Sequence, residues 1–142
     1  MNKLMPHIIS GDKFIDSRGI VLSCNNFDMS NVKRIYSIEN SDCSFVRGWK
    51  GHKIETRWFF ASKGTMIINT VAISDLEKNK TLNSLNSFSL SDENLDILKV
   101  PPGYATSIKQ FSSGNRICVF ADYKLNSSGD EDLRWELKNT IK

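Results

Sequence analysis

Short strand-like segments, each ended by a turn, recur along this chain at a spacing of about ten residues. The clearest are 65–73, which is rich in β-branched residues, and 116–123. Turn-forming residues separate the segments, as at 62–64 and 101–103, because Gly, Pro, Asn and Asp adopt turn conformations at little cost. A chain of many short strands with this punctuation predicts an all-β sandwich or barrel.

Strands are expected within 8–15, 20–23, 32–38, 47–61, 65–73, 82–90, 95–100, 104–111 and 116–123. Both alternating positions of 65–73 are apolar, which predicts that both faces of this strand are covered. The polar residues 75–80 are interpreted as a hairpin tip. A short C-terminal helix is predicted within 130–142, where apolar residues recur at spacings of four.

The length of 142 residues favours one domain, spanning 1–142. A net charge of +3 is too small and too dispersed to indicate a nucleic-acid partner. The first ten residues, interrupted by Pro6, resemble neither a signal peptide nor a membrane span. Three widely spaced cysteines are typical of a reduced protein with incidental thiols. We therefore expect a cytoplasmic protein that binds neither nucleic acid nor membrane.

Cationic side chains are concentrated in 46–57, among residues that favour β-strands. Residues two apart on a strand share a face, so Lys50 and His52 would project together, with Gly51 between them leaving room for a ligand. A solvated strand has no need of two cations on one face with tryptophans on either side. This pattern predicts the wall of a polar, anion-binding pocket.

Several motifs follow one another in a familiar order. They are Phe14-Ile15-Asp16-Ser17-Arg18-Gly19, Lys33-Arg34-Ile35-Tyr36, Arg47-Gly48 with His52-Lys53, Gly64, Pro101-Pro102-Gly103-Tyr104, Asp122-Tyr123 and Leu133-Arg134-Trp135. This order resembles that of the RmlC-like cupins that act on nucleotide-linked 4-keto sugars. Two branches are relevant: dTDP-4-dehydrorhamnose 3,5-epimerases and WxcM-like dTDP-4-keto-6-deoxyhexose 3,4-ketoisomerases. The resemblance runs from about residue 14 to 135 and implies a double-stranded β-helix, the jelly-roll cupin barrel, usually a homodimer with exchanged N-terminal strands.

The ketoisomerase branch has Arg-Gly-x-His-x-His-Lys where this chain has 47–53. Arg47, Gly48, His52 and Lys53 match this motif, but Lys50 stands where both branches place a histidine, which is the general base of the epimerases. The resemblance therefore leaves the catalytic half of the site less well preserved than the binding half.

Residue roles implied by the resemblance fall into two groups. The catalytic candidates are His52, Lys50, Tyr123 and Tyr36. The substrate-binding candidates are Arg18, Arg47, Arg57, Tyr104 and Asp130. Arg18 and Arg47 resemble the diphosphate-binding arginines of the epimerases, and Arg57 lies near their enolate-facing lysine. In the same comparison Thr106 and Cys118 replace a histidine and the general-acid tyrosine.

Proton transfer through an enolate suits these residue types. A base removes a proton next to the ketone, a cation stabilises the enolate, and an acid returns the proton elsewhere. His52 is the natural base, whereas Lys50 is either a base made neutral by nearby cations or a charged partner of the enolate or phosphate. Of the cupin metal positions only His52 and Glu55 remain, and two ligands do not hold a catalytic divalent ion. We expect no metal and no cofactor.

Each candidate also has a structural interpretation. His52 can serve only as a structural hydrogen-bonding group, Tyr104 and Tyr123 as core residues with a wet hydroxyl, and Asp130 as a charge at a helix N-terminus. The favoured hypothesis is a metal-free isomerase or epimerase of a dTDP-linked 4-keto-6-deoxy sugar that serves surface-polysaccharide synthesis. The alternatives are a catalytically lapsed cupin that binds a sugar nucleotide as a partner or regulatory subunit, and an enzyme for a different nucleotide.

Overall fold

The structure, a computed structural model, describes residues 5–79, 83–125 and 133–137. Its elements are β1 (His7–Ile9), β2 (Asp12–Asp16), β3 (Gly19–Ser23), β4 (Arg34–Ile38), β5 (Val46–His52), β6 (Arg57–Lys63), β7 (Thr65–Ala72), α1 (Ile73–Glu77), β8 (Asn86–Ser91), β9 (Ile97–Val100), β10 (Tyr104–Gln110), β11 (Arg116–Ala121) and β12 (Leu133–Arg134). The strands therefore follow the predicted segments closely. In the part of the chain that is described, no helix is long and apolar enough to cross a membrane.

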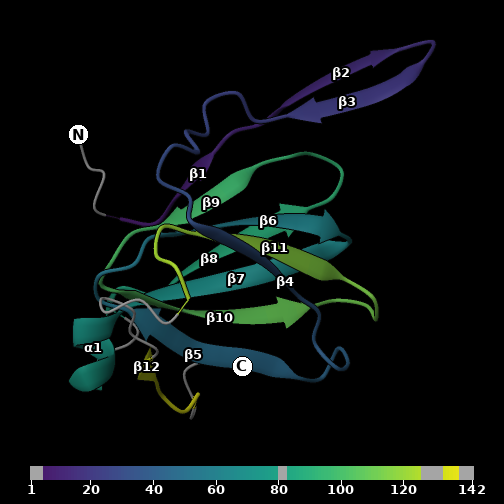
Figure 1. The fold of residues 1–142 in the computed structure, drawn as a ribbon. Helices are drawn as coiled ribbons and strands as arrows, with labels where there is room; N and C mark the ends of the chain where they lie inside the picture. Colours follow the sequence, from purple (N-terminus) through teal and green to yellow (C-terminus); the bar gives the residue numbers. More distant parts are fainter. Residues whose placement is uncertain (1–4, 80–82, 126–132, 138–142) are drawn as a thin grey trace.

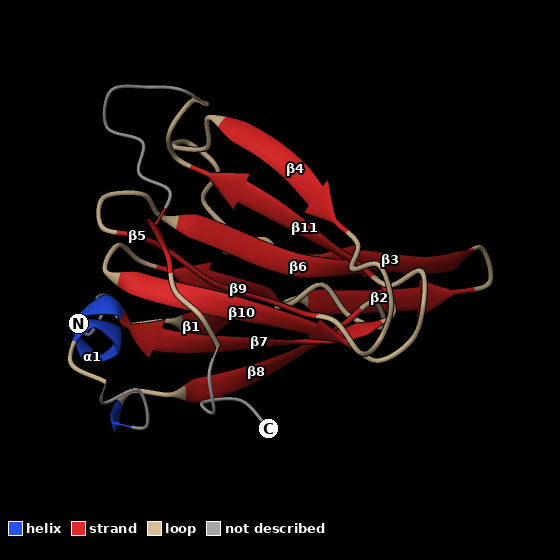
Figure 2. Cartoon of the chain, turned by 90° about the horizontal axis from the view of Figure 1, so that it is seen from below, coloured by secondary structure: helices blue, strands red, loops and turns tan. Residues whose placement is uncertain are grey.

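Two five-stranded antiparallel sheets form the body of the molecule (Figures 1 and 2). The first has the strand order β1-β9-β6-β11-β4 and the second β12-β5-β10-β7-β8. Neighbouring strands in each sheet are mostly distant in sequence, which is typical of a jelly roll, in which successive strands alternate between two sheets. The predicted all-β class is confirmed.

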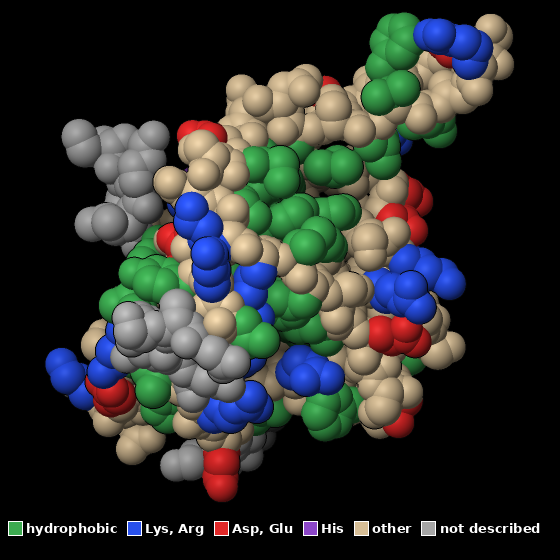
Figure 3. All heavy atoms as spheres, viewed as in Figure 1, with side chains coloured by type: hydrophobic (Ala, Val, Ile, Leu, Met, Phe, Trp, Pro, Cys, Tyr) green, Lys and Arg blue, Asp and Glu red, His purple; other side chains and the backbone are tan. Residues whose placement is uncertain are grey.

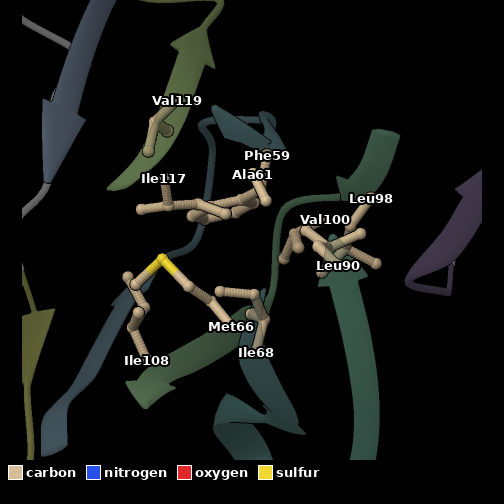
Figure 4. Close-up of a cluster of buried hydrophobic side chains, with 10 residues drawn as sticks. All are labelled: Phe59, Ala61, Met66, Ile68, Leu90, Leu98, Val100, Ile108, Ile117 and Val119. Carbon is tan, nitrogen blue, oxygen red and sulfur yellow. The ribbon is translucent and has the colours of Figure 1, made fainter. Parts of the chain in front are cut away.

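The hydrophobic core lies between the inner faces of the two sheets (Figure 4). Ten buried side chains form it: Phe59, Ala61, Met66, Ile68, Leu90, Leu98, Val100, Ile108, Ile117 and Val119. They recur mainly at every second position of their strands, so each strand presents one apolar face to the core. This packing fixes which side chains of β6 and β10 point inward.

A second cluster of buried side chains lies on the outer face of the second sheet. Trp49, Val71 and Ala105 pack there with residues Ile73 and Leu76 of α1. Met66 and Ile68 face the core while Val71 faces this cluster, which confirms that both faces of β7 are covered. The hairpin tip expected at 75–80 does lie in the connection between β7 and β8, which pair antiparallel. Its first part is α1 and not a turn, because the apolar side chains three apart, at 73 and 76, make one turn of helix that covers the sheet.

The described part of the predicted C-terminal helix forms a strand instead. A short helix is present in the molecule, but it is α1, whereas Leu133–Arg134 is β12 and pairs antiparallel with β5. Trp49 and Trp135 extend this pairing, each donating its backbone N–H to the other's carbonyl oxygen at 3.0 Å. Leu133, Trp135 and Leu137 are half-buried while Arg134 and Glu136 are exposed. This period of two is the pattern of a strand; the spacing of four between leucines fits a helix and a strand equally well.

The β2–β3 hairpin projects away from the two sheets (Figure 1). It carries exposed apolar residues, and hydrophobic and basic side chains are both visible on it in Figure 3. Phe14, Ile15, Ile20 and Val21 are each 59–63% exposed. Because single exposed apolar residues are ordinary but four on one hairpin are not, this element is suited to contact another surface.

Candidate functional site

A cavity of about 460 Å³ opens between the two sheets. It is lined by Tyr36, Ile38, Arg47, Gly48, Trp49, Lys50, Arg57, Phe59, Thr106, Ile108, Arg134, Trp135 and Glu136. Four of the lining residues are cationic and one is a carboxylate. Aromatic and aliphatic side chains make up most of the remainder, so the cavity is suited to an anion that also carries a flat or apolar group.

A β-bulge in β5 brings two of the cations onto the cavity wall. Arg47 is paired with Ile108 and Lys50 with Thr106, so two residues of β5, Gly48 and Trp49, lie opposite a single residue of β10. In a regular strand residues three apart point to opposite faces. The extra residue reverses the alternation, and both Arg47 and Lys50 line the cavity.

Gly48 is required at this bulge. Its φ is +141°, a conformation that side chains disfavour. A Cβ at residue 48 would lie only 2.7 Å from the Cα of Ser107, on the neighbouring strand. The Arg-Gly pair in the sequence therefore has a local cause, since the glycine permits the bulge that turns Arg47 inward.

Arg57 spans the cavity from the first sheet to the second. Its side chain is buried, with 2% of the residue exposed. One guanidinium nitrogen donates to Thr106 Oγ1 at 3.2 Å, and another donates to the carbonyl oxygens of Tyr104, at 3.4 Å, and Lys50, at 3.5 Å. The guanidinium carbon also lies 5.4 Å from the centre of the Phe59 ring. These contacts fix a buried positive charge deep in the cavity.

Arg47 lies at the mouth of the cavity and is held by Asn40. The Nε of Arg47 donates to Asn40 Oδ1 at 3.4 Å. Asn40 is itself buried, and its side-chain nitrogen donates to the carbonyl oxygens of Phe45 and Ile108 at 3.1 and 3.2 Å. The backbone N–H of Asn40 donates to Gln110 Oε1 at 2.9 Å. A buried amide network therefore orients an exposed arginine.

His52 faces the same side of β5 as Lys50 but does not line the cavity. The two residues pair with Tyr104 and Thr106, which are also two apart, so the predicted common face is confirmed. His52 and Glu55 are almost fully buried, and His52 Nε2 lies 3.7 Å from Glu55 Oε2. The imidazole therefore faces a carboxylate in a closed part of the barrel, next to the open cavity.

Three further predicted site residues, Arg18, Tyr104 and Tyr123, are not part of the cavity lining. Tyr104 packs against the core and contributes only its carbonyl oxygen to Arg57, and Tyr123 is half-buried beyond the end of β11. Arg18, on the projecting hairpin, pairs with Asp16 at 2.7 Å, and its hydrogen bonds hold the pKa of that carboxyl below the usual value. Asp130 lies outside the described residues.

Arg134, Trp135 and Glu136 also line the cavity, and none of them was predicted as a site residue from the sequence. They belong to β12 and the residues directly after it, where a helix had been expected. The alternation of polar and apolar residues from 133 to 137 is the signal that places Arg134 and Glu136 on one face. With the strand assignment, the C-terminal segment becomes a wall of the cavity.

No three metal-ligating side chains come together among the described residues. His52 and Glu55 are adjacent, but Thr106, which stands in a cupin metal position, is a hydrogen-bond acceptor for Arg57. The donor set of the cavity wall is cationic, which does not fit a divalent ion. Cys118 is buried on β11, and this burial raises the pKa of its thiol.

Comparisons with known proteins place the fold. No protein-family model matches the sequence, and no curated relative is found. Among solved structures, a dTDP-4-dehydrorhamnose 3,5-epimerase from Bacillus anthracis with TDP and PPi bound has a TM-score of 0.75 and 16% identity, over 97% of this chain and 82% of that one.

Two ketoisomerases are also similar. A 3,4-ketoisomerase from Helicobacter canadensis has a TM-score of 0.69 and 21% identity, over 91% of this chain and 90% of that one. The TDP-quinovose 3,4-ketoisomerase WlaRB from Campylobacter jejuni has a TM-score of 0.66 and 20% identity, over 94% of each chain. The fold is therefore that of the RmlC-like cupins, as predicted.

Proposed function

We propose that this protein is an RmlC-like isomerase or epimerase of a dTDP-linked 4-keto-6-deoxy sugar, of the 3,5-epimerase or 3,4-ketoisomerase type. The observation that carries the proposal is the cationic cavity inside a barrel shared with such enzymes. In this proposal the enzyme works in the cytoplasm and supplies an unusual sugar for surface polysaccharide.

The cavity matches the two ends of such a substrate. A volume of about 460 Å³ lies within the range of small-molecule sites. Guanidinium groups bind phosphate through paired donors, and Arg47 offers such a group at the mouth. Tyr36 lines the wall formed by β4. The guanidinium carbon of Arg34 lies 4.7 Å from the centre of this ring, so a sugar or a base would stack on one face only.

The proton transfers are assigned to side chains that line the cavity. Arg57 and the hydroxyl of Thr106 lie deepest, where they would stabilise the oxyanion of the enolate. Lys50, beside Arg57, is placed to remove the proton next to the ketone, since neighbouring positive charges favour the neutral amine. Tyr36 would return the proton. His52, which is buried beside Glu55 on the same face of β5, would help to position Lys50 without contacting the substrate.

The direct test is turnover in deuterated water. The protein is incubated with dTDP-4-keto-6-deoxyglucose, and deuterium at C3 and C5 and any 3-keto product are followed by NMR. Uptake at C3 and C5 indicates the epimerase type, and a 3-keto product the ketoisomerase type. Tight binding of dTDP with neither outcome would contradict the proposal and favour a cupin that binds without catalysis.

Assembly into a homodimer is part of the same proposal. The four exposed apolar residues of the β2–β3 hairpin support it, because a second subunit would cover them. Exchange of hairpins would also carry Arg18 to the other subunit. Light scattering on the full chain measures the mass, and a monomer at micromolar concentration would contradict this part of the proposal.

A further inference from the structure

A row of inward-facing side chains crosses the second sheet at the level of Lys50. Thr106 of β10 pairs with Lys50 of β5, and Lys50 pairs with Arg134 of β12. All three line the cavity. Arg57 reaches the inner end of this row through its hydrogen bond to Thr106. The row therefore runs from the centre of the barrel to the edge of the sheet.

Exposure increases along this row of basic side chains. Arg57 is buried, Lys50 is half-buried and Arg134 is exposed. Directly opposed residues on neighbouring strands have Cβ atoms about 5 Å apart, so Arg134 begins next to Lys50, and its positive charge favours the neutral Lys50 amine. The guanidinium of Arg134 thus brings positive charge to the exposed edge of the sheet, and the carboxylate of Glu136 is the one acidic group in the described lining.

The geometry points to Arg134 as a phosphate-binding residue that holds the diphosphate of the nucleotide sugar at the edge of the second sheet. In such a ligand the phosphate is bonded to C1 of the sugar, while the ketone lies across the ring. The phosphate site must therefore lie about one sugar ring away from the residues that act on the ketone. Arg134 stands in that relation to Lys50 and Arg57, one strand further toward solvent.

The identity of the ligand rests on the proposed function, but the anion site does not. Arginine is suited to this role because its planar guanidinium can donate two parallel hydrogen bonds to one phosphate. Its position on β12, paired through the backbone with β5, fixes where the side chain begins. Arg47, on the other side of the bulge, would remain a second and separate contact at the mouth.

The test compares the full-length protein with Arg134→Gln and Arg134→Lys by calorimetry, using dTDP, inorganic pyrophosphate and thymidine. Arg116→Gln is the matched control, because Arg116 is an exposed arginine on β11 that pairs with Glu39 at 3.1 Å and does not line the cavity. We expect Arg134→Gln to weaken dTDP and pyrophosphate by about tenfold, the usual loss for a charge-assisted hydrogen bond, with thymidine unchanged. The affinity of Arg134→Lys for dTDP and pyrophosphate should lie between those of Arg134→Gln and the wild type. Arg116→Gln should bind both ligands as the wild type does.

Kinetics separate this role from a structural one. Loss of a phosphate contact that is equal in the ground and transition states raises KM and leaves kcat unchanged. The melting temperature of Arg134→Gln should match that of the control. Equal affinity of Arg134→Gln and wild type for dTDP and pyrophosphate would overturn the inference, as would absence of pyrophosphate binding by the wild type. If pyrophosphate binds through Arg134 but the ketosugar is not turned over, the proposed function fails and the anion site stands.

Discussion

Lys50 and His52 occupy successive inward positions of one strand and have opposite surroundings. Lys50 opens onto a cavity of about 460 Å³, whereas His52 is buried against Glu55. From the sequence His52 is the better candidate base, but in the structure Lys50 lines the cavity and His52 does not. Access, which depends on the loops around a strand, decides the role as much as the side chain does.

Two loops close the His52 end of the barrel. The backbone N–H of Gly103 donates to the carbonyl oxygen of His52 at 2.8 Å, and that of Thr56 donates to Asp122 Oδ1 at 2.9 Å. At Lys50, Arg57 donates a hydrogen bond to the carbonyl oxygen of the lysine at 3.5 Å, and Lys50 itself lines the open cavity. The same strand thus runs from a closed polar region into an open one.

Removal of the Lys50 amine should have the largest effect. We expect Lys50→Met to lower kcat for the ketosugar by about 10²–10⁴-fold, the usual contribution of a general base, with dTDP still bound. The NMR assay of product formation measures this. Lys53→Met is the matched control, since Lys53 is an exposed lysine that pairs with Glu77 at 3.5 Å. Equal turnover by Lys50→Met and the wild type would contradict the assignment of Lys50 as the general base.

His52→Phe should act on stability more than on turnover. Leaving the buried Glu55 carboxylate beside a phenyl ring is expected to lower the free energy of unfolding by about 3 kcal/mol, measured by urea denaturation. The kcat of the folded protein should fall by less than about tenfold, below the contribution of a general base. A larger loss of kcat with unchanged stability would instead make His52 the base.

Gly48→Ala tests whether the bulge sets the open end of the strand. The positive φ and the close approach of Ser107 predict a loss of about 2 kcal/mol in unfolding free energy, and a weaker affinity for dTDP because Arg47 is displaced. Gly114→Ala is the control, because Gly114 also has a positive φ, +82°, but a Cβ there meets only the side chain of Lys63, at 3.5 Å, and the residue does not line the cavity. A dTDP affinity unaffected by Gly48→Ala would separate the bulge from the site.

Asn40→Ser should have the smallest effect. It shortens the amide that accepts a hydrogen bond from Arg47, so the arginine becomes less well oriented. We expect the Kd for dTDP to rise by about threefold, equivalent to a hydrogen bond of below 1 kcal/mol, with kcat unchanged. Calorimetry measures the first and the NMR assay the second; the effect should vanish in an Arg47→Gln background.

The fold was largely readable from the sequence because β-branched runs and turn residues mark most strands. The covered strand β7 illustrates this, since its two apolar faces pack on two separate clusters. The segment that became β12 was misread because Leu133 and Leu137 fit both periods. Pairing with β5, a contact distant in sequence, decided between them.

The site was predicted in part. Tyr36, Arg47, Lys50 and Arg57 line the cavity, and each was singled out from its motif. Arg134 was missed with its strand. The inward direction of the Arg47 side chain depends on a bulge, which a glycine permits but which a glycine in the sequence does not by itself predict. The burial of His52 depends on loops from other parts of the chain.

The bulge at Gly48 and Trp49 has a consequence for how such a protein can change. A strand interrupted by one extra residue has two halves whose side-chain alternation is set independently. Substitutions before the bulge, around Arg47, can alter what enters the cavity, while those after it, around Lys50, alter what happens to the ligand. Ligand binding and catalysis can therefore change independently, although only two residues of the strand separate Arg47 from Lys50.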